Sequence, residues 1–170
     1  NNGDKQNVLK QTIQFPNLKE QISDVVRTIF QDSKGNIWFG VQGGAFKLAG
    51  DSLIHIDSIR SESGGRVTIK VIAEDKDGII WFGHTDGISS IDGTFVTNYY
   101  ESDGLISNAV WCIGSDAEGK IWIGTMEGAC IFDGKTFSNF ELPLGIKDTT
   151  VGVSSDKMIN KIFRDSKGIL

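Results

Sequence analysis

One nine-residue string, repeated along the chain, limits what this sequence can fold into more than any other feature. "DSKGNIWFG" starts at Asp32, "DKDGIIWFG" at Asp75 and "DAEGKIWIG" at Asp116, and a shortened "DSKGIL" starts at Asp165. The four aspartates lie 43, 41 and 49 residues apart. A period of about 42 residues is typical of a protein that stacks copies of one structural unit.

Each copy of the unit contains four short apolar segments separated by Gly/Asp turns. In the second copy these segments are "TIKVIAED", "IIWFGH", "GISSID" and "TFVTNYY". Their length, and the absence of a helical period, predict β-strands. The "IWFG" segment is apolar on both faces, so both faces of its sheet are expected to be covered. The sequence therefore predicts an all-β fold of β-propeller blades, each a four-stranded antiparallel sheet.

The residues of the repeated string have physical roles in such a blade. The aspartate accepts hydrogen bonds from backbone N–H groups of the turn, and the glycine three residues later takes a positive φ. The tryptophan is expected in the core, where its indole N–H needs a partner. The glycine two residues after it leaves room for the neighbouring sheet. These core tryptophans are Trp38, Trp81 and Trp122.

The repeat also predicts the organisation of the chain. Residues 1–7 form a flexible tether, and residues 8–170 form about three complete blades plus partial ones. The blades span about 24–58, 67–100 and 109–141, with the start of another at 158–170, and Gln11 to Phe15 form an outer closing strand. We interpret the chain as part of a longer propeller. Open blade faces would also favour self-association.

Composition excludes several classes of function. The chain has 170 residues, 39% of them hydrophobic, and a net charge of -5. An acidic chain with scattered lysines is a poor partner for nucleic acid or for an anionic membrane surface, because both need a basic patch. Its longest apolar runs are far too short to span a bilayer.

The pattern D-x-x-G-x-[IL]-W-[FI]-G-x-x-x-G resembles the two-component regulator propeller repeat, and "YYESDGLISNAVWCI" resembles the segment between blades in that family. The resemblance covers about residues 8–170. It implies a periplasmic or extracellular sensor propeller, with a lipid anchor as one option. It also implies an oligosaccharide or small-molecule ligand, and downstream signalling domains as partners. Two alternatives stay open: an exported lipoprotein that serves as a protein-interaction scaffold, and a propeller enzyme similar to streptogramin lyase.

The innermost strand of each blade offers the best candidate binding position. Propellers commonly bind ligands where the innermost strands begin, beside the central channel. The residue five positions before each repeat aspartate changes character from blade to blade: Arg27, Lys70, Trp111 and Asn160. Three positions before the aspartate the residue is always isoleucine, which indicates core: Ile29, Ile72, Ile113 and Ile162. The variable position is therefore expected to face a ligand.

The loops between the second and third strands are expected on the same face. They supply the remaining candidates, Gln42, His84, Asp86 and Glu127. The ring of Trp111 would cover the apolar face of a sugar, and the polar groups would fix its hydroxyls. In the alternative interpretation Trp111 fills the channel and the cations are solvated.

The sequence contains no catalytic or metal-binding motif, and it implies no cofactor. His55 is expected to face solvent, and His84 to lie in a loop, without metal-ligand spacing. "DKDGI" lacks the later ligands of a calcium loop. Cys112 and Cys130 fall on the first and third strands of one blade, about 10 Å apart by strand spacing. That distance is too long for a disulfide, so two free, buried thiols are expected.

Overall fold

The computed structural model describes residues 25–143, 150 and 155–165, and their regular structure is nearly all β. One short 3₁₀ turn, η1 (Glu101–Asp103), lies between the second and third groups of strands. The strands are β1 (Val26–Gln31), β2 (Ile37–Val41), β3 (Gly44–Ala49), β4 (Ser52–Ile56), β5 (Ile69–Glu74), β6 (Ile80–His84), β7 (Gly87–Asp92), β8 (Phe95–Tyr99), β9 (Val110–Ser115), β10 (Ile121–Thr125), β11 (Gly128–Phe132) and β12 (Phe137–Phe140).

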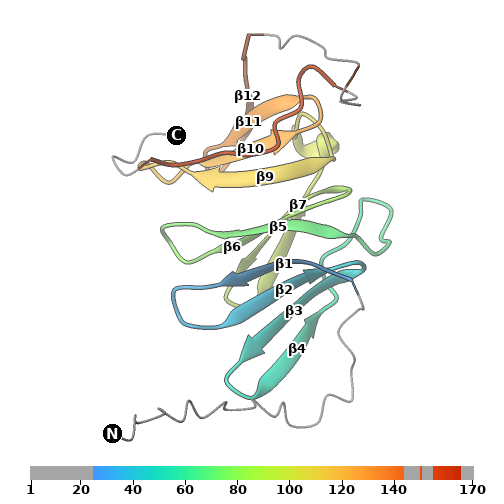
Figure 1. Ribbon diagram of the computed structural model, residues 1–170, viewed down its shortest axis with the longest axis vertical. Helices are drawn as coiled ribbons and strands as arrows, with labels where there is room; N and C mark the ends of the chain where they lie inside the picture. The colour runs from blue at the N-terminus through green and yellow to red at the C-terminus, as the bar shows by residue number, and fades with distance from the viewer. Residues whose placement is uncertain (1–24, 144–149, 151–154, 166–170) are drawn as a thin grey trace, which may run out of the picture.

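The strands form three antiparallel sheets of four, and each sheet follows chain order from β1 to β4, from β5 to β8 and from β9 to β12. This confirms the predicted blades. The three sheets are stacked in Figure 1, and the inner strands β1, β5 and β9 contact one another in sequence. Among the described residues, no helix has the length and apolar character needed to cross a membrane.

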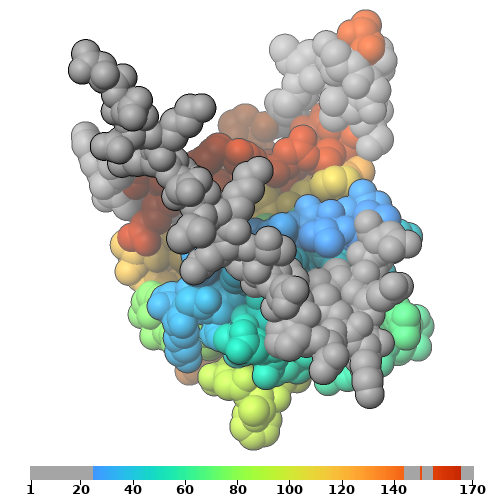
Figure 2. All heavy atoms as spheres, turned by 60° about the horizontal axis from the view of Figure 1, so that its bottom comes forward, coloured from blue at the N-terminus to red at the C-terminus, as the bar shows by residue number. Residues whose placement is uncertain are grey.

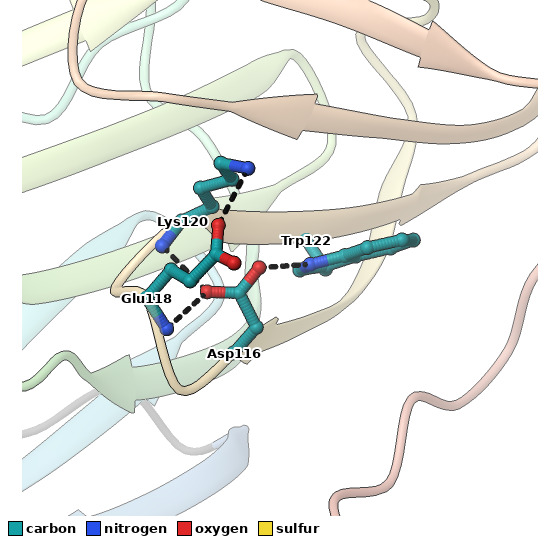
Figure 3. Close-up of polar contacts among 4 residues, drawn as sticks. All are labelled: Asp116, Glu118, Lys120 and Trp122. Carbon is teal, nitrogen blue, oxygen red and sulfur yellow. Dashed lines mark hydrogen bonds and ion pairs between the residues drawn. The ribbon is translucent and has the colours of Figure 1, made fainter. Parts of the chain in front are cut away.

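The repeated aspartate joins each turn to the strand that follows it. In the third blade one carboxylate oxygen of Asp116 accepts the backbone N–H groups of Glu118 and Lys120, at 3.0 and 2.9 Å (Figure 3). Its other oxygen accepts the indole N–H of Trp122 at 3.0 Å. The same indole bond is 2.9 Å long in the first blade and 2.8 Å in the second. One side chain therefore satisfies both the turn and the tryptophan.

The tryptophan face of each of the first two blades packs on the next blade along the chain. Trp38 meets Phe82 edge to face, with ring centroids 5.6 Å apart, and Trp81 meets Phe132 in the same way at 5.7 Å. Each contact lies inside a continuous cluster of buried apolar side chains. The core of the molecule therefore consists of two layers, one between each pair of neighbouring blades.

The glycine that follows the tryptophan is required by this packing. A Cβ atom at Gly83 would lie 2.6 Å from Val110 of the next blade. At Gly40 the corresponding neighbour is Ile69, and at Gly124 it is Ile159. Ile159 also donates its backbone N–H to the carbonyl of Thr125. The chain around Ile159 thus occupies the place that an inner strand takes against the two earlier blades, and we propose that it begins the fourth blade.

Three positions expected in the core are less buried than predicted: Ile29, Trp122 and the half-buried Ile162. Ile72 and Ile113 are buried, but Ile29 is 64% exposed because no blade precedes the first within the described residues. Figure 2 shows the blue residues of this first blade at the surface. Trp122 is only half-buried and contacts Phe140. The predicted tether 1–7 and the closing strand 11–15 lie outside the described residues.

Candidate functional site

The variable position of the inner strand is a β-bulge in all three blades. In β9 the residues on either side of Trp111 pair with the consecutive residues Gly124 and Thr125, which leaves Trp111 as the extra residue. Lys70 in β5 and Arg27 in β1 are the extra residues at the equivalent register shifts. A bulge residue has no cross-strand partner, and bulges often redirect a side chain beside a functional site.

Three of the predicted site residues form one row across the inner strands. The ammonium of Lys70 lies 3.5 Å from the centroid of the Trp111 ring. Arg27 is near enough to act electrostatically on Lys70. Trp111 stays 37% exposed and Arg27 is exposed. One face of the indole is thus occupied by a cation, so a ligand would meet its other face or its edge.

Burial lowers the pKa of the Lys70 ammonium, and the positive charge of Arg27 lowers it further. The Lys70 side chain is half-buried, so its interactions are less screened than those of a fully solvated group. Among the described residues the ion pairs are Arg60–Asp57 and Lys120–Glu118, and neither cation of the row takes part. The row is therefore a cationic patch with an aromatic neighbour.

His84 does not lie in a loop, as the sequence suggested; it is the last residue of β6 and is fully buried. Its Nδ1 accepts the backbone N–H of Asp86, and its Nε2 lies 2.9 Å from the hydroxyl of Ser89. The Ser89 hydroxyl donates onward to Asn98. Burial lowers the pKa of His84 to about 4. His84 is therefore a neutral structural group and not a surface ligand contact.

Asp86 belongs to a separate acidic region on the side of the linker between blades. Its carboxylate accepts the backbone N–H of Glu62 at 3.1 Å. Burial raises the pKa of Tyr100, and the charges of Asp86, Glu62 and Asp103 raise it further. The carboxylate of Asp86 is thus engaged by the backbone of the linker.

The remaining candidates lie at other places in the fold. Gln42 is exposed and forms an isolated β-bridge with Thr68 of the second blade. Glu127 lines a cavity of ≈ 530 Å³ beside the third blade, together with Asp156 and Ile159. Asn160 is exposed next to Ile159. The structure therefore brings together Arg27, Lys70 and Trp111, and Asn160 holds the equivalent position before the fourth repeat aspartate. Gln42, His84, Asp86 and Glu127 contact other groups.

The bulge escaped the sequence analysis, although the sequence carries a signal for it. In "TIKVIAED" the apolar alternation breaks at Val71 and Ile72, which are consecutive, and "AVWCIGSD" breaks at the same place. A bulge shifts the alternation by one residue. His55, expected to face solvent, is half-buried and stacks on Phe46 at 4.7 Å.

The chemistry of the cysteines is confirmed. Cys112 and Cys130 are free and buried. Burial raises the pKa of Cys112 to about 11 and also raises that of Cys130, so both stay protonated at neutral pH. In the described part of the chain, no group of three or more His, Cys, Asp or Glu residues is arranged to hold a metal ion.

Comparison with known proteins identifies the repeat. The family model described as "Two component regulator propeller" matches residues 20–43, 61–86 and 104–127. The extracellular domain assigned to the hybrid two-component system BT3049 of B. thetaiotaomicron is 31% identical, with a TM-score of 0.67, and the match covers 86% of this chain. A search of the curated proteins found no match.

A second solved structure is less similar. The extracellular domain assigned to the hybrid two-component system BT4673 of the same organism is 20% identical over 71% of this chain, with a TM-score of 0.46. The present chain spans 20% of the BT3049 domain and 22% of the BT4673 domain. Of these two domains, the BT3049 domain is the one similar enough to support the fold.

Proposed function

This chain is built from repeats of the two-component regulator propeller family, and on that basis we propose that it forms part of the extracellular sensor domain of a two-component system. The likeness to the BT3049 domain supports a position outside the cytoplasm, in the periplasm or beyond it. Because the chain spans a fifth of that domain, the remaining blades and the signalling domains would be its partners.

We further propose that the propeller captures a carbohydrate at the face where the inner strands begin. The observation that carries this proposal is the exposed Trp111 on a bulge, with Lys70 and Arg27 beside it. An indole offers an apolar surface to a sugar ring, and neighbouring polar groups fix the hydroxyls.

The proposal is tested by titrating the chain with a panel of oligosaccharides and following its indole N–H resonances by NMR. Three of the four indoles donate to a repeat aspartate, so the Trp111 resonance is distinguishable from theirs. Trp111→Ala should abolish binding and cost less than about 1 kcal/mol of unfolding free energy, the value of an exposed cation–π contact.

Phe95→Ala is the matched control, since Phe95 is 78% exposed and lies at a hairpin outside the row. It should leave binding unchanged. Binding that survives Trp111→Ala would place the ligand elsewhere. A loss of several kcal/mol in the same variant would identify Trp111 as a core residue.

A further inference from the structure

The bulge row holds two like charges together without a counter-charge among the described residues. Arg27 and Lys70 occupy the same bulge position on the adjacent strands β1 and β5. Neither takes part in the ion pairs of the described residues. Two neighbouring cations repel each other, and the repulsion grows as water is removed from around them. Such a pair gains most from an anion placed between its members.

The position of the Lys70 ammonium is fixed and not free. Its side chain is half-buried, and its nitrogen rests over the Trp111 ring at 3.5 Å. A cation over an aromatic face is held by the negative centre of the ring. The ammonium still has N–H donors directed away from the ring, because it carries three. It therefore keeps N–H donors for an anionic group.

The predicted carboxylates of the site do not neutralise this pair. Asp86 accepts from the backbone of Glu62, and Glu127 lines the cavity beside the third blade. Burial and the charge of Arg27 depress the pKa of Lys70, and no acidic side chain of the described residues acts in the opposite direction. An occupant of the row must therefore bring its own negative charge to be well matched electrostatically.

We propose that Arg27 and Lys70 bind an anionic group of the ligand, a carboxylate or a sulfate ester carried by an acidic saccharide whose ring lies against the edge of Trp111 that Lys70 leaves open. The proposal rests on the proposed function and names the class of ligand. A guanidinium binds either oxyanion through two parallel N–H donors, and the ammonium adds a third. The shared requirement is a planar or tetrahedral oxyanion attached to a sugar.

The experiment compares an acidic saccharide with its neutral ester, and a sulfated saccharide with inorganic sulfate. The probes are trigalacturonate, its methyl ester, a sulfated galactose oligomer and inorganic sulfate, with binding measured by calorimetry and by the Trp111 resonance. Acidic saccharides should bind at least about tenfold more tightly than the neutral ester, the effect of one charge-assisted hydrogen bond. If trigalacturonate binds more tightly than the sulfated oligomer, the site recognises a carboxylate; the reverse order indicates a sulfate ester.

Three methionine variants test the residues. Lys70→Met and Arg27→Met keep the aliphatic stems and remove the charges, and each should weaken binding of the acid at least about tenfold while leaving that of the neutral ester unchanged. Lys47→Met is the matched control, since Lys47 also lies over a tryptophan ring, Trp38 at 5.0 Å, but outside the row. It should change affinity by less than about twofold.

The ways in which the two proposals could fail are distinguishable. If the ester binds as tightly as the acid and Lys70→Met has no effect, the charge inference is overturned and carbohydrate capture stands. If inorganic sulfate binds as tightly as the sulfated oligomer, the anion site is supported and carbohydrate recognition is overturned. If neither saccharides nor inorganic sulfate shift the Trp111 resonance, both proposals are wrong for this face.

Discussion

Replacement of Asp75 by alanine should destabilise the chain far more than the loss of an ordinary turn residue. The Asp75 carboxylate accepts the backbone N–H groups of Asp77 and Ile79, at 2.9 and 3.0 Å, and the indole N–H of Trp81 at 2.8 Å. Trp81 is only 4% exposed, and the half-buried Asp75 lines an open pocket with it, so water can replace the lost acceptor only in part. The variant therefore leaves the indole donor without its protein acceptor at the layer between the second and third blades.

The magnitude follows from these bonds. Two turn hydrogen bonds contribute about 1 kcal/mol together, and an unpaired buried donor costs about 1–3 kcal/mol. Asp75→Ala should thus lower the free energy of unfolding by about 2–4 kcal/mol. Asp75→Asn keeps an oxygen for the turn but directs an amide N–H at the indole, and it should cost about 1–2 kcal/mol.

Asp133→Ala provides the matched control. Asp133 accepts the backbone N–H groups of Lys135 and Thr136 in an exposed hairpin, and no tryptophan of the described residues donates to it. Urea unfolding followed by circular dichroism measures the three variants, and an unchanged m value confirms that the transitions are comparable. If Asp75→Ala costs no more than Asp133→Ala, the indole bond contributes nothing and this account of the repeated aspartate is wrong.

Two further predictions concern the second blade. Because the pKa of His84 is about 4 in the folded protein and about 6.5 in the unfolded chain, stability should fall as pH drops from 6.5 to 4, by up to about 3 kcal/mol. His84→Thr, which introduces the residue found at the equivalent position Thr125, should flatten that slope in denaturation measured across pH, and an unaltered slope would refute it. Gly83→Ala should cost about 1–3 kcal/mol by thermal unfolding, through overpacking against Val110, whereas an unchanged Tm would show that the blades can separate.

The fold could be predicted because the repeat presents each signal three times. Asp, Gly, Trp and Gly recur at fixed spacing, so chance agreement in one copy is corrected by the others. The sequence also predicts, as two separate facts, that the repeated aspartate accepts hydrogen bonds in the turn and that the buried indole N–H needs a partner. That the aspartate is itself the partner of the indole depends on the geometry of the hairpin. This geometry places the indole nitrogen of Trp38 2.9 Å from a carboxylate oxygen of Asp32, six residues earlier.

Burial was harder to predict, because it depends on neighbours and not on the residue itself. Ile29 and Ile72 occupy the same place in their strands, yet one is 64% exposed and the other 6%. The difference is the blade that covers Ile72. The prediction that His84 lies in a loop was wrong for a related reason, because a polar residue beside a turn is expected to be exposed. Its ring instead satisfies a backbone N–H, a task that Thr125 performs in the third blade.

The candidate site was found through variation among repeats, and the bulge explains why that variation exists. A residue in the ladder must suit both its cross-strand partner and the neighbouring blade, so isoleucine recurs three positions before the aspartate. Neither requirement applies to the extra residue of a bulge. Arg27, Lys70 and Trp111 can therefore differ in size and charge without disturbing the layers beneath them. Because packing does not dictate these residues, their chemistry is available to select a ligand.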